Sequence, residues 1–510
     1  MGNVTILTLT GLGSQLTGFV YRVLLTRLAG AEVLGLYQLI LPVYGVLTAL
    51  TAGGLTTGVS NLTAACHAEG DRRGMGQVRS QAVGLFLLLS ALPCLALLLF
   101  SGKISVLLLG DGRTRLGLTL LAPCLVLTGV ENLHKHYFYG VGKVVPPAVT
   151  ELLEQLLRAG LCLGCLVVLH PAAPAGALGA VVLGMALCEA AAAAVQTALF
   201  RRDMGPAARR PGPGRSPRRI RRGLGHIAAP LGLAAVLGSL LSSANALLIP
   251  RLLVRSGMAR SEAVAAYGVV FGMALPMLLV PTAFLSALGL VLTPALARHA
   301  ALGDRAAIRD CVSRAAEGMG LALLPALALL AALGPALGQA LYGTYRVGEH
   351  LPLLSLGVLF SCWQGLWTGV LSGLGRQRTA AAIALTCDGL QLALTVPAVW
   401  RWGLSGYGAC FALTALLGAA WSRRAAERET GAGVPLFRWL LAPALTAALA
   451  AACGSLMETA LLRGGLDPLP AAGGGLAFGA LLVPAALGAM GVRFPSLDMR
   501  QAEKRPPAAP

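Results

Sequence analysis

Fourteen runs of about 20 largely apolar residues occupy most of the chain, and each is long enough to cross a bilayer as a helix. Only 12% of the 510 residues are charged, against about 25% in soluble globular chains. The apolar residues are mostly Leu, Ala, Val and Gly, which is typical of closely packed membrane helices. The sequence therefore predicts an all-α polytopic membrane protein. The predicted spans cover residues 4–29, 34–64, 81–101, 116–139, 146–169, 175–199, 225–250, 264–296, 312–336, 349–373, 379–400, 403–421, 437–461 and 469–492.

The positions of Lys and Arg predict the orientation of these spans. If the N-terminus is cytoplasmic, cytoplasmic segments hold 27 of the 40 Lys and Arg, external segments hold nine, and four lie inside spans. Cytoplasmic loops of membrane proteins are enriched in these residues. We therefore expect a multi-pass protein of the bacterial plasma membrane with both termini in the cytoplasm. Residues 4–29 lack a preceding basic segment and are interpreted as an uncleaved first span.

A basic block, RRDMGPAARRPGPGRSPRRIRRGLGH, covers residues 201–226 and carries nine arginines against one acid. In isolation such a block is typical of nucleic-acid-binding arms. Its place between the sixth and seventh spans instead indicates a cytoplasmic connector, flexible because of its Pro and Gly. Its arginines suit anionic membrane lipids. We therefore expect no nucleic-acid partner, although the chain has a net charge of +19.

The two halves of the chain resemble each other. Residues 139–169 and 372–400 align without gaps, and each stretch opens with a G-x-G-(K/R) turn. This repeat predicts two six-helix lobes related by a pseudo-two-fold axis, followed by two C-terminal helices, which is a transporter architecture. The predicted parts are an N-terminal lobe (1–200), a linker (201–224), a C-terminal lobe (225–425), helices 13 and 14 (426–495) and a cytoplasmic tail (496–510).

Arginines inside the first span are candidates for function. An ionisable side chain at the centre of a bilayer costs at least about 2.5–3.5 kcal/mol on insertion scales. Arg22 lies well inside the span and is predicted either to face a central cavity or to pair with an acid. Arg27 lies nearer the end, where it can also reach the interface. The planar guanidinium group suits phosphate because it donates two hydrogen bonds at once.

Acids and bases four residues apart predict two ion pairs within helices. Glu154 and Arg158 lie in the fifth span, one turn after Glu151, and Glu131 and Lys135 lie in the fourth. In one interpretation each pair only neutralises itself so that the helix can insert. In the other, the fifth-span pair lines the cavity and exchanges partners during transport.

Asp388, the lone acid of the eleventh span, and Asn245, a polar residue deep in the seventh, are candidates for coupling to Na⁺ or H⁺. The alternative is a hydrogen bond between helices. Glu189 in the sixth span is a weaker candidate of the same kind. We expect no other cofactor and no metal site, because Cys162 and Cys165 lie in an apolar run without a second Cys/His pair at zinc spacing. No catalytic motif such as a Walker loop, G-x-S-x-G or H-E-x-x-H occurs, so no catalytic residue and no enzyme activity are predicted.

Several stretches resemble the polysaccharide-transport branch of the multidrug/oligosaccharidyl-lipid/polysaccharide exporter superfamily, especially its stage V sporulation protein B group. They include GFVYRVLLTRLAGAEVLGLYQLILPVYGVLTALTAGGL, PPAVTELLEQLLRAG and VLSGLGRQR, in order along nearly the whole chain. The resemblance implies two six-helix lobes, fourteen helices in some flippase members, and alternation between inward-open and outward-open states. It also implies transport of undecaprenyl-diphosphate-linked sugars, including peptidoglycan precursor.

Carried over residue by residue, the resemblance assigns Arg22 to the diphosphate of the substrate. It places Glu151, Glu154, Gln155 and Arg158 on a fifth-helix E-x-x-E-Q-x-x-R pattern of unassigned role. Asp388 loosely resembles part of a sodium site on the seventh and eleventh helices of related flippases, but the seventh span here offers Asn245 instead of an acid.

The leading prediction is a monomeric flippase for lipid-linked diphosphate oligosaccharide, working by alternating access. A multidrug cation antiporter on the same fold is the first alternative, although its cavity would favour acids over Arg22 and Arg158. The second alternative is a non-transporting membrane scaffold for cell-wall or spore-cortex assembly, for which a polar cavity has no purpose.

Overall fold

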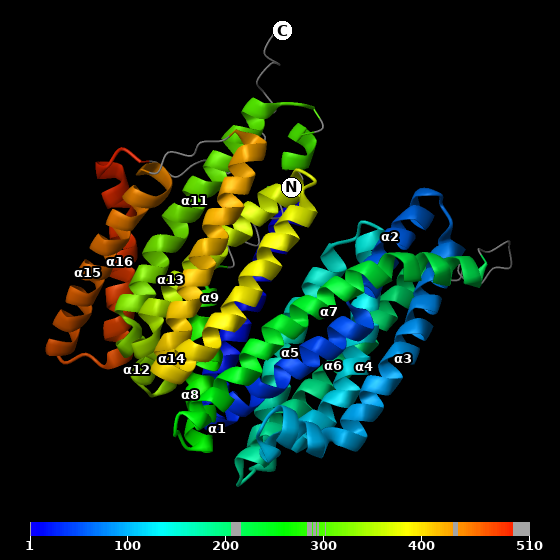
Figure 1. The fold of residues 1–510 in the computed structure, drawn as a ribbon, viewed down its shortest axis with the longest axis horizontal. Coiled ribbons are helices and arrows are strands. Elements are labelled where there is room, and N and C mark those ends of the chain that lie inside the picture. The colour runs from blue at the N-terminus through cyan, green and yellow to red at the C-terminus, as the bar shows by residue number, and fades with distance from the viewer. Residues whose placement is uncertain are drawn as a thin grey trace. The chain divides into compact units, whose positions relative to one another are not determined.

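A computed structural model describes residues 2–205, 216–282, 288, 292, 295–300, 302–431 and 437–492. Within these residues the chain forms helices and short connections without any strand, so the predicted all-α class is confirmed (Figure 1). The helices divide into two compact units, residues 1–268 and 269–510.

The first unit, residues 1–268, contains ten helical elements, in chain order. They are α1 (Gly2–Ala52), α2 (Leu55–Ala68), α3 (Arg72–Lys103), η1 (Ile104–Leu108), η2 (Gly112–Thr114), α4 (Arg115–Gly140), α5 (Val145–Leu169), α6 (Pro174–Met204), α7 (Pro217–Arg255) and α8 (Arg260–Tyr267).

The second unit, residues 269–510, follows from the π-helical segment η4 (Gly268–Ala274). Its described elements are α9 (Leu275–Leu279), α11 (Arg305–Ala332), α12 (Gly334–Tyr342), α13 (Arg346–Gly373), α14 (Gln377–Thr430), η5 (Phe437–Leu441), α15 (Ala442–Arg463) and α16 (Pro468–Ala489).

Two of the twelve described segments that are long and apolar enough to cross a membrane exceed the length of one crossing. They cover Leu9–Ala68 and Gln377–Thr430, with 60 and 54 residues, or about 90 and 80 Å at 1.5 Å per residue. The apolar core of a bilayer is only about 30 Å thick. Each segment is broken by a glycine with positive φ, Gly30 (82°) and Gly403 (57°). Each therefore supplies two spans, which gives the fourteen that were predicted.

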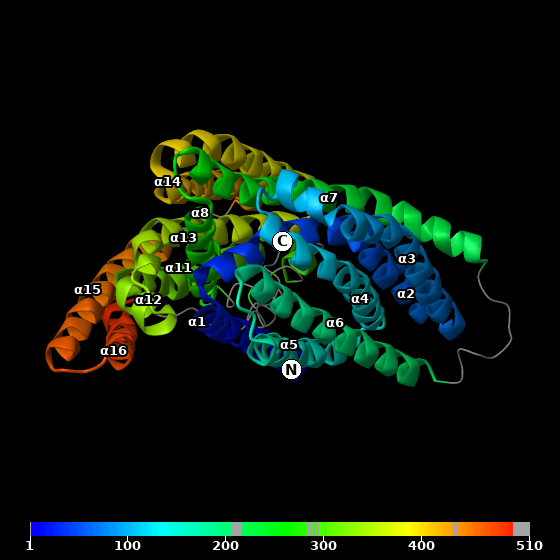
Figure 2. The ribbon, with the colours of Figure 1, turned by 90° about the horizontal axis from the view of Figure 1, so that it is seen from below.

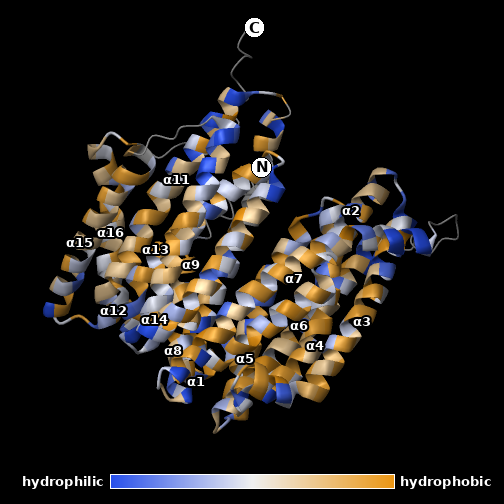
Figure 3. Cartoon of the chain, viewed as in Figure 1, coloured by the Kyte–Doolittle hydropathy of each residue, from blue (hydrophilic) through white to orange (hydrophobic). Residues whose placement is uncertain are grey.

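Hydrophobic side chains cover most of the length of these helices, and hydrophilic ones gather toward their ends and connections (Figure 3). The eighth predicted span, 264–296, lies partly outside the described residues, as does the predicted tail 496–510 in full.

Helix α6 is the centre of the first unit, since it packs against both α4 and α5, while α1 packs against α5 and α7 (Figures 1 and 2). An aromatic cluster joins α3, α4 and α6: Phe86, Tyr137 and Phe200 are buried, and the rings of Tyr137 and Phe200 meet edge to face at 4.7 Å. This packing fixes the relative rotation of α4 and α6, on which the polar site described below depends.

The predicted linker 201–224 is helical at both ends. Helix α6 continues to Met204, and α7 begins at Pro217, while residues 206–215 lie outside the described part. Proline is well tolerated in the first turn of a helix, and arginine is a good helix former, so Pro217 starts a helix here. Helix α7 then packs along α1, α2 and α3 of the first unit. The predicted lobes describe helices that move together, and their boundaries stay a prediction.

Helices α1 and α8 approach each other backbone to backbone. A Cβ atom on Gly35 would collide with the carbonyl oxygen of Val264, and one on Gly268 with that of Ala31. Small residues at such crossings let membrane helices gain close van der Waals contact.

We expect Gly35→Ala to lower the stability of the protein, because the added methyl group forces α1 and α8 apart. Overpacking of this kind costs about 1–3 kcal/mol. Thermal unfolding of the detergent-purified protein measures the effect. Gly84→Ala in α3 is the matched control, since no other atom lies within 4 Å of the new methyl group. Equal unfolding temperatures for the two variants would contradict the tight crossing.

Candidate functional site

Five charged side chains form a continuous network inside the first unit. Glu131 and Lys135 come from α4, Glu154 and Arg158 from α5, and Glu189 from α6. The Nζ atom of Lys135 lies 2.7 Å from Glu131 Oε1 and 3.0 Å from Glu154 Oε2. The Nη2 atom of Arg158 lies 2.5 Å from Glu154 Oε1 and 2.7 Å from Glu189 Oε1. Glu154 therefore bridges the two cations.

The network is buried. The exposed fractions of the Glu131, Glu154 and Glu189 side chains are 2%, 8% and 1%, and those of Lys135 and Arg158 are 12% and 21%. A buried charge without a partner is strongly destabilising. Each carboxylate here has a cation within 3.0 Å, so the ion pairs make these five residues compatible with the membrane interior.

Helix geometry and close packing together build this arrangement. In α4 and in α5 an acid precedes a base by four residues, which is the more favourable order for a helical ion pair. Glu189 joins because α6 lies against both helices. Gly184 permits this approach, since a Cβ there would stand within 2.7 Å of the Cys162 backbone nitrogen.

Hydrogen bonds extend the network to α1. Glu189 Oε2 accepts a hydrogen bond from Thr128 Oγ1. The Tyr44 hydroxyl of α1 lies 2.6 Å from Thr128 Oγ1. The polar connection therefore links α1, α4, α5 and α6.

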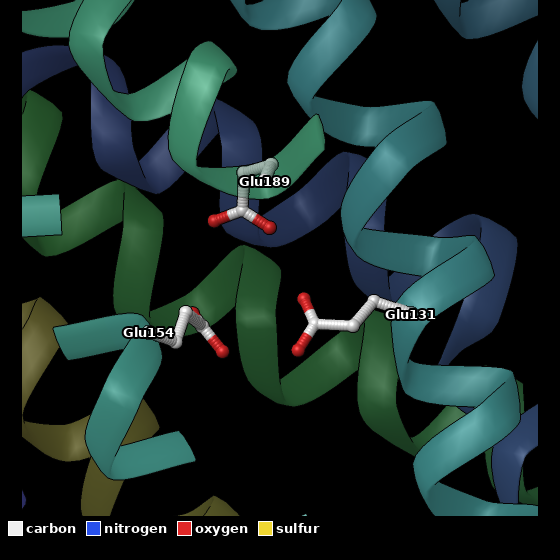
Figure 4. Close-up of side chains that lie close together, drawn as sticks. All are labelled: Glu131, Glu154 and Glu189. Atoms are coloured by element: carbon white, nitrogen blue, oxygen red, sulfur yellow. The ribbon is translucent and has the colours of Figure 1, made fainter. Parts of the chain in front are cut away.

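The three carboxylates point toward one another from three helices (Figure 4). One oxygen of each lies within 4.8 Å of the others, a spacing that could hold a cation. Lys135 and Arg158 already occupy this space with two positive charges. With all five groups ionised the network carries a formal charge of −1. One more positive charge, either a proton on one carboxyl group or a small cation, would neutralise it.

The structure separates the residues that the sequence predicted for substrate binding. Glu154 and Arg158 lie in the network, whereas Glu151 is exposed on the same helix. Gln155 is partly buried and faces α1 near Gly18.

Arg22 and Arg27 both lie on α1, outside the network. Arg22 is partly buried and has no ion pair among the described residues, and Arg27 is exposed. Tyr37 lies within electrostatic range of both Arg22 and Arg158. Arg22 is therefore a neighbour of the network without being a member of it.

The two residues predicted for cation coupling belong to different units. Asp388 is exposed on α14 and makes no ion pair among the described residues. Asn245 is partly buried on α7, and its Oδ1 atom has no hydrogen-bond partner. Their joint role stays a prediction.

Sequence reasoning found the two helical pairs but not their connection. It treated Glu131–Lys135 and Glu154–Arg158 as separate and ranked Glu189 low. The only sequence signal was that α4, α5 and α6 each carry an acid in a span, at Glu131, Glu154 and Glu189.

Comparisons with known proteins agree with this fold. Residues 1–299 match the family described as polysaccharide biosynthesis protein. Stage V sporulation protein B of Bacillus subtilis (strain 168) is 29% identical over 166 residues, which is 32% of this chain and 32% of that relative. The matched region thus spans about a third of the relative's length.

Among solved structures, the lipid II flippase MurJ in an inward closed conformation is similar over 95% of this chain and 99% of that one, with a TM-score of 0.70 and 11% identity. An inward-facing multidrug resistance MATE family transporter of the MOP superfamily is similar over 81% and 95%, with a TM-score of 0.66 and 15% identity. These likenesses establish a shared fold.

We expect Arg158→Ala to destabilise the protein strongly, because it leaves Glu154 and Glu189 without the cation that they share. Breaking a buried ion pair by removing one partner costs about 3–5 kcal/mol. Glu189→Gln keeps the size of the side chain and removes the excess negative charge, so its loss should be much smaller. Thermal unfolding in detergent compares the two variants. A similar loss in both would show that the charge balance of the network is unimportant.

Proposed function

We propose that this chain, which belongs to the polysaccharide biosynthesis protein family, is a flippase that moves undecaprenyl-diphosphate-linked oligosaccharide across the bacterial plasma membrane by alternating access. The observation that carries the proposal is Arg22, a partly buried arginine in a membrane span that has no ion pair among the described residues. The shared fold with a lipid II flippase and the partial match to a sporulation protein support it.

The chemistry of Arg22 suits a diphosphate. An unpaired guanidinium inside a bilayer needs water or an anion to offset the loss of solvation. Its planar donors match two phosphate oxygens at once. Arg158 is less suited to the substrate, since Glu154 and Glu189 already share its Nη2 group. Arg22 therefore receives the diphosphate, with Arg27 closer to the end of the same span.

The buried network supplies a means of coupling. It lacks one positive charge, and in this proposal it takes up one proton or sodium ion during the transport cycle. Asp388, with Asn245, is the alternative location for that ion. The cycle requires no covalent step, in keeping with relatives that are named as transporters.

A multidrug cation antiporter is the second candidate, because the fold also matches a multidrug transporter with a TM-score of 0.66. The exposed carboxylate of Asp388 in α14 would suit a cationic drug. An unpaired Arg22 would repel it, which places this candidate second.

We expect Arg22→Ala to slow the translocation of fluorescent lipid II in reconstituted vesicles. A hydrogen bond to a charged group contributes about 1.5–3 kcal/mol, so the rate should fall about 10- to 150-fold. Arg463→Ala, an exposed arginine at the end of α15, is the matched control and should translocate at the wild-type rate.

The same vesicles separate the alternative functions. Equal rates for wild type and Arg22→Ala would remove this residue from the mechanism. Export of ethidium without lipid movement would favour the antiporter. Vesicles that move neither compound would favour a membrane scaffold.

We expect Glu189→Gln to abolish the dependence of translocation on a pH or sodium gradient. The substitution leaves two carboxylates and two cations, so the network no longer needs another positive charge. Initial rates with and without each gradient measure the effect. Asp388→Asn is the companion variant, and loss of gradient dependence in this variant alone would move the coupling site to α14.

A further inference from the structure

A pocket of about 290 Å³ at one end of the first unit is lined by three arginines. It lies where the connection between η1 and η2 meets the last turns of α7 and the first residues of α8. Arg251 and Arg255 come from α7, Arg260 comes from α8, and Asp111 is the one acid in the lining. In the predicted orientation this end of the unit faces the outside.

Asp111 does not neutralise these arginines, because another residue already holds its carboxylate. The Arg113 guanidinium donates to it through Nε at 2.9 Å and Nη2 at 2.6 Å, and the Arg113 backbone N–H donates at 3.0 Å. Burial raises the pKa of Asp111, but these hydrogen bonds outweigh it and hold the pKa below its usual value. Arg113 also pairs with Glu32 at 2.5 Å. Both acids near the pocket therefore already share Arg113, which does not line it.

Arg251 is fixed by the backbone. Its Nη2 group donates to the carbonyl oxygens of Leu107 and Leu108 at the end of η1. Gly110, with φ of +73°, makes the turn that follows and packs against this side chain. The arginine thus forms a rigid wall of the pocket.

Arg255 and Arg260 have no such partners. Both are exposed, and neither makes an ion pair within the described residues. Glu262, the acid nearest to Arg260 in the sequence, is also exposed and makes none. The pocket therefore brings together two guanidinium groups that repel each other and have no counter-charge.

The remaining wall is apolar. It is formed by Leu39, Val106, Leu109, Pro250, Val254 and Val264. A small soluble anion has no use for such a wall, whereas a lipid presents a phosphate and hydrocarbon side by side. Basic pockets between membrane helices are suited to lipid headgroups.

We propose that this pocket binds the phosphate of an anionic lipid, with Arg255 and Arg260 donating to the phosphate oxygens beside the fixed Arg251. Guanidinium groups bind phosphate in a bidentate manner. The lipid is either an anionic phospholipid or a polyprenyl diphosphate, which share this headgroup chemistry. The site does not depend on the proposed transport function, because its lining lies wholly within the first unit.

Native mass spectrometry of the purified full-length protein tests the site. Phosphatidylglycerol, phosphatidylcholine and a polyprenyl diphosphate are titrated separately, and inorganic pyrophosphate is added as a competitor. We expect wild type to retain phosphatidylglycerol or the diphosphate well above phosphatidylcholine. The double variant R255Q/R260Q should bind the retained anionic lipid about 30-fold more weakly. R346Q/R463Q, two exposed arginines of the second unit, is the control and should bind as wild type does.

The outcomes separate the two lipid sources. Preference for phosphatidylglycerol assigns the site to a phospholipid, and preference for the polyprenyl diphosphate, with displacement by pyrophosphate, assigns it to a diphosphate. Unchanged lipid retention in R255Q/R260Q would overturn the proposal, as would equal retention of phosphatidylcholine by wild type. R255K/R260K retains the charge without the planar fork, so intermediate affinity in that variant supports bidentate binding. An unaltered unfolding temperature shows that both double variants are folded.

Discussion

A charge inside a bilayer must find its counter-charge within the protein, and the first unit depends on how its buried acids meet this requirement. Glu154 serves both Lys135 and Arg158, so α4 and α5 cannot separate without exposing a carboxylate or a cation to the membrane interior. Glu189 adds α6 to the same assembly. The energy of breaking a buried ion pair, about 3–5 kcal/mol, thus opposes independent movement of these helices.

The structure gives two arginines of similar sequence context different roles. Arg22 and Arg158 both lie within apolar helices, and the sequence predicted both for substrate binding. Arg158 shares its Nη2 group between two buried carboxylates, whereas Arg22 has no acid partner among the described residues. A guanidinium that is already paired holds helices together, and one that is not can bind a mobile anion. The distinction depends on neighbours from other helices, which the residue's own helix does not reveal.

Features that depend on one helix at a time were predictable. The fourteen spans follow from the lengths of the apolar runs, including the breaks now found at Gly30 and Gly403. The two i, i+4 pairs follow from helical periodicity. The place of Glu189 was not predictable, because it depends on which face of α6 meets α4 and α5. The same holds for the pocket of Arg255 and Arg260, whose walls come from segments more than 100 residues apart.

The single excess negative charge of the network has the right size to influence a conformational equilibrium. Burying one unpaired charge costs at least about 2.5–3.5 kcal/mol, which corresponds to a shift of roughly 70- to 400-fold in an equilibrium constant. A proton or sodium ion bound at Glu131, Glu154 and Glu189 would stabilise the packed arrangement of α4, α5 and α6 by about that amount. Its release would favour any arrangement in which one carboxylate reaches water. Because Arg22 lies close to this network through Tyr37, an anion at Arg22 and a cation in the network would attract each other. The proposed substrate and the coupling ion would therefore favour each other's binding, which is the thermodynamic requirement for their coupled transport.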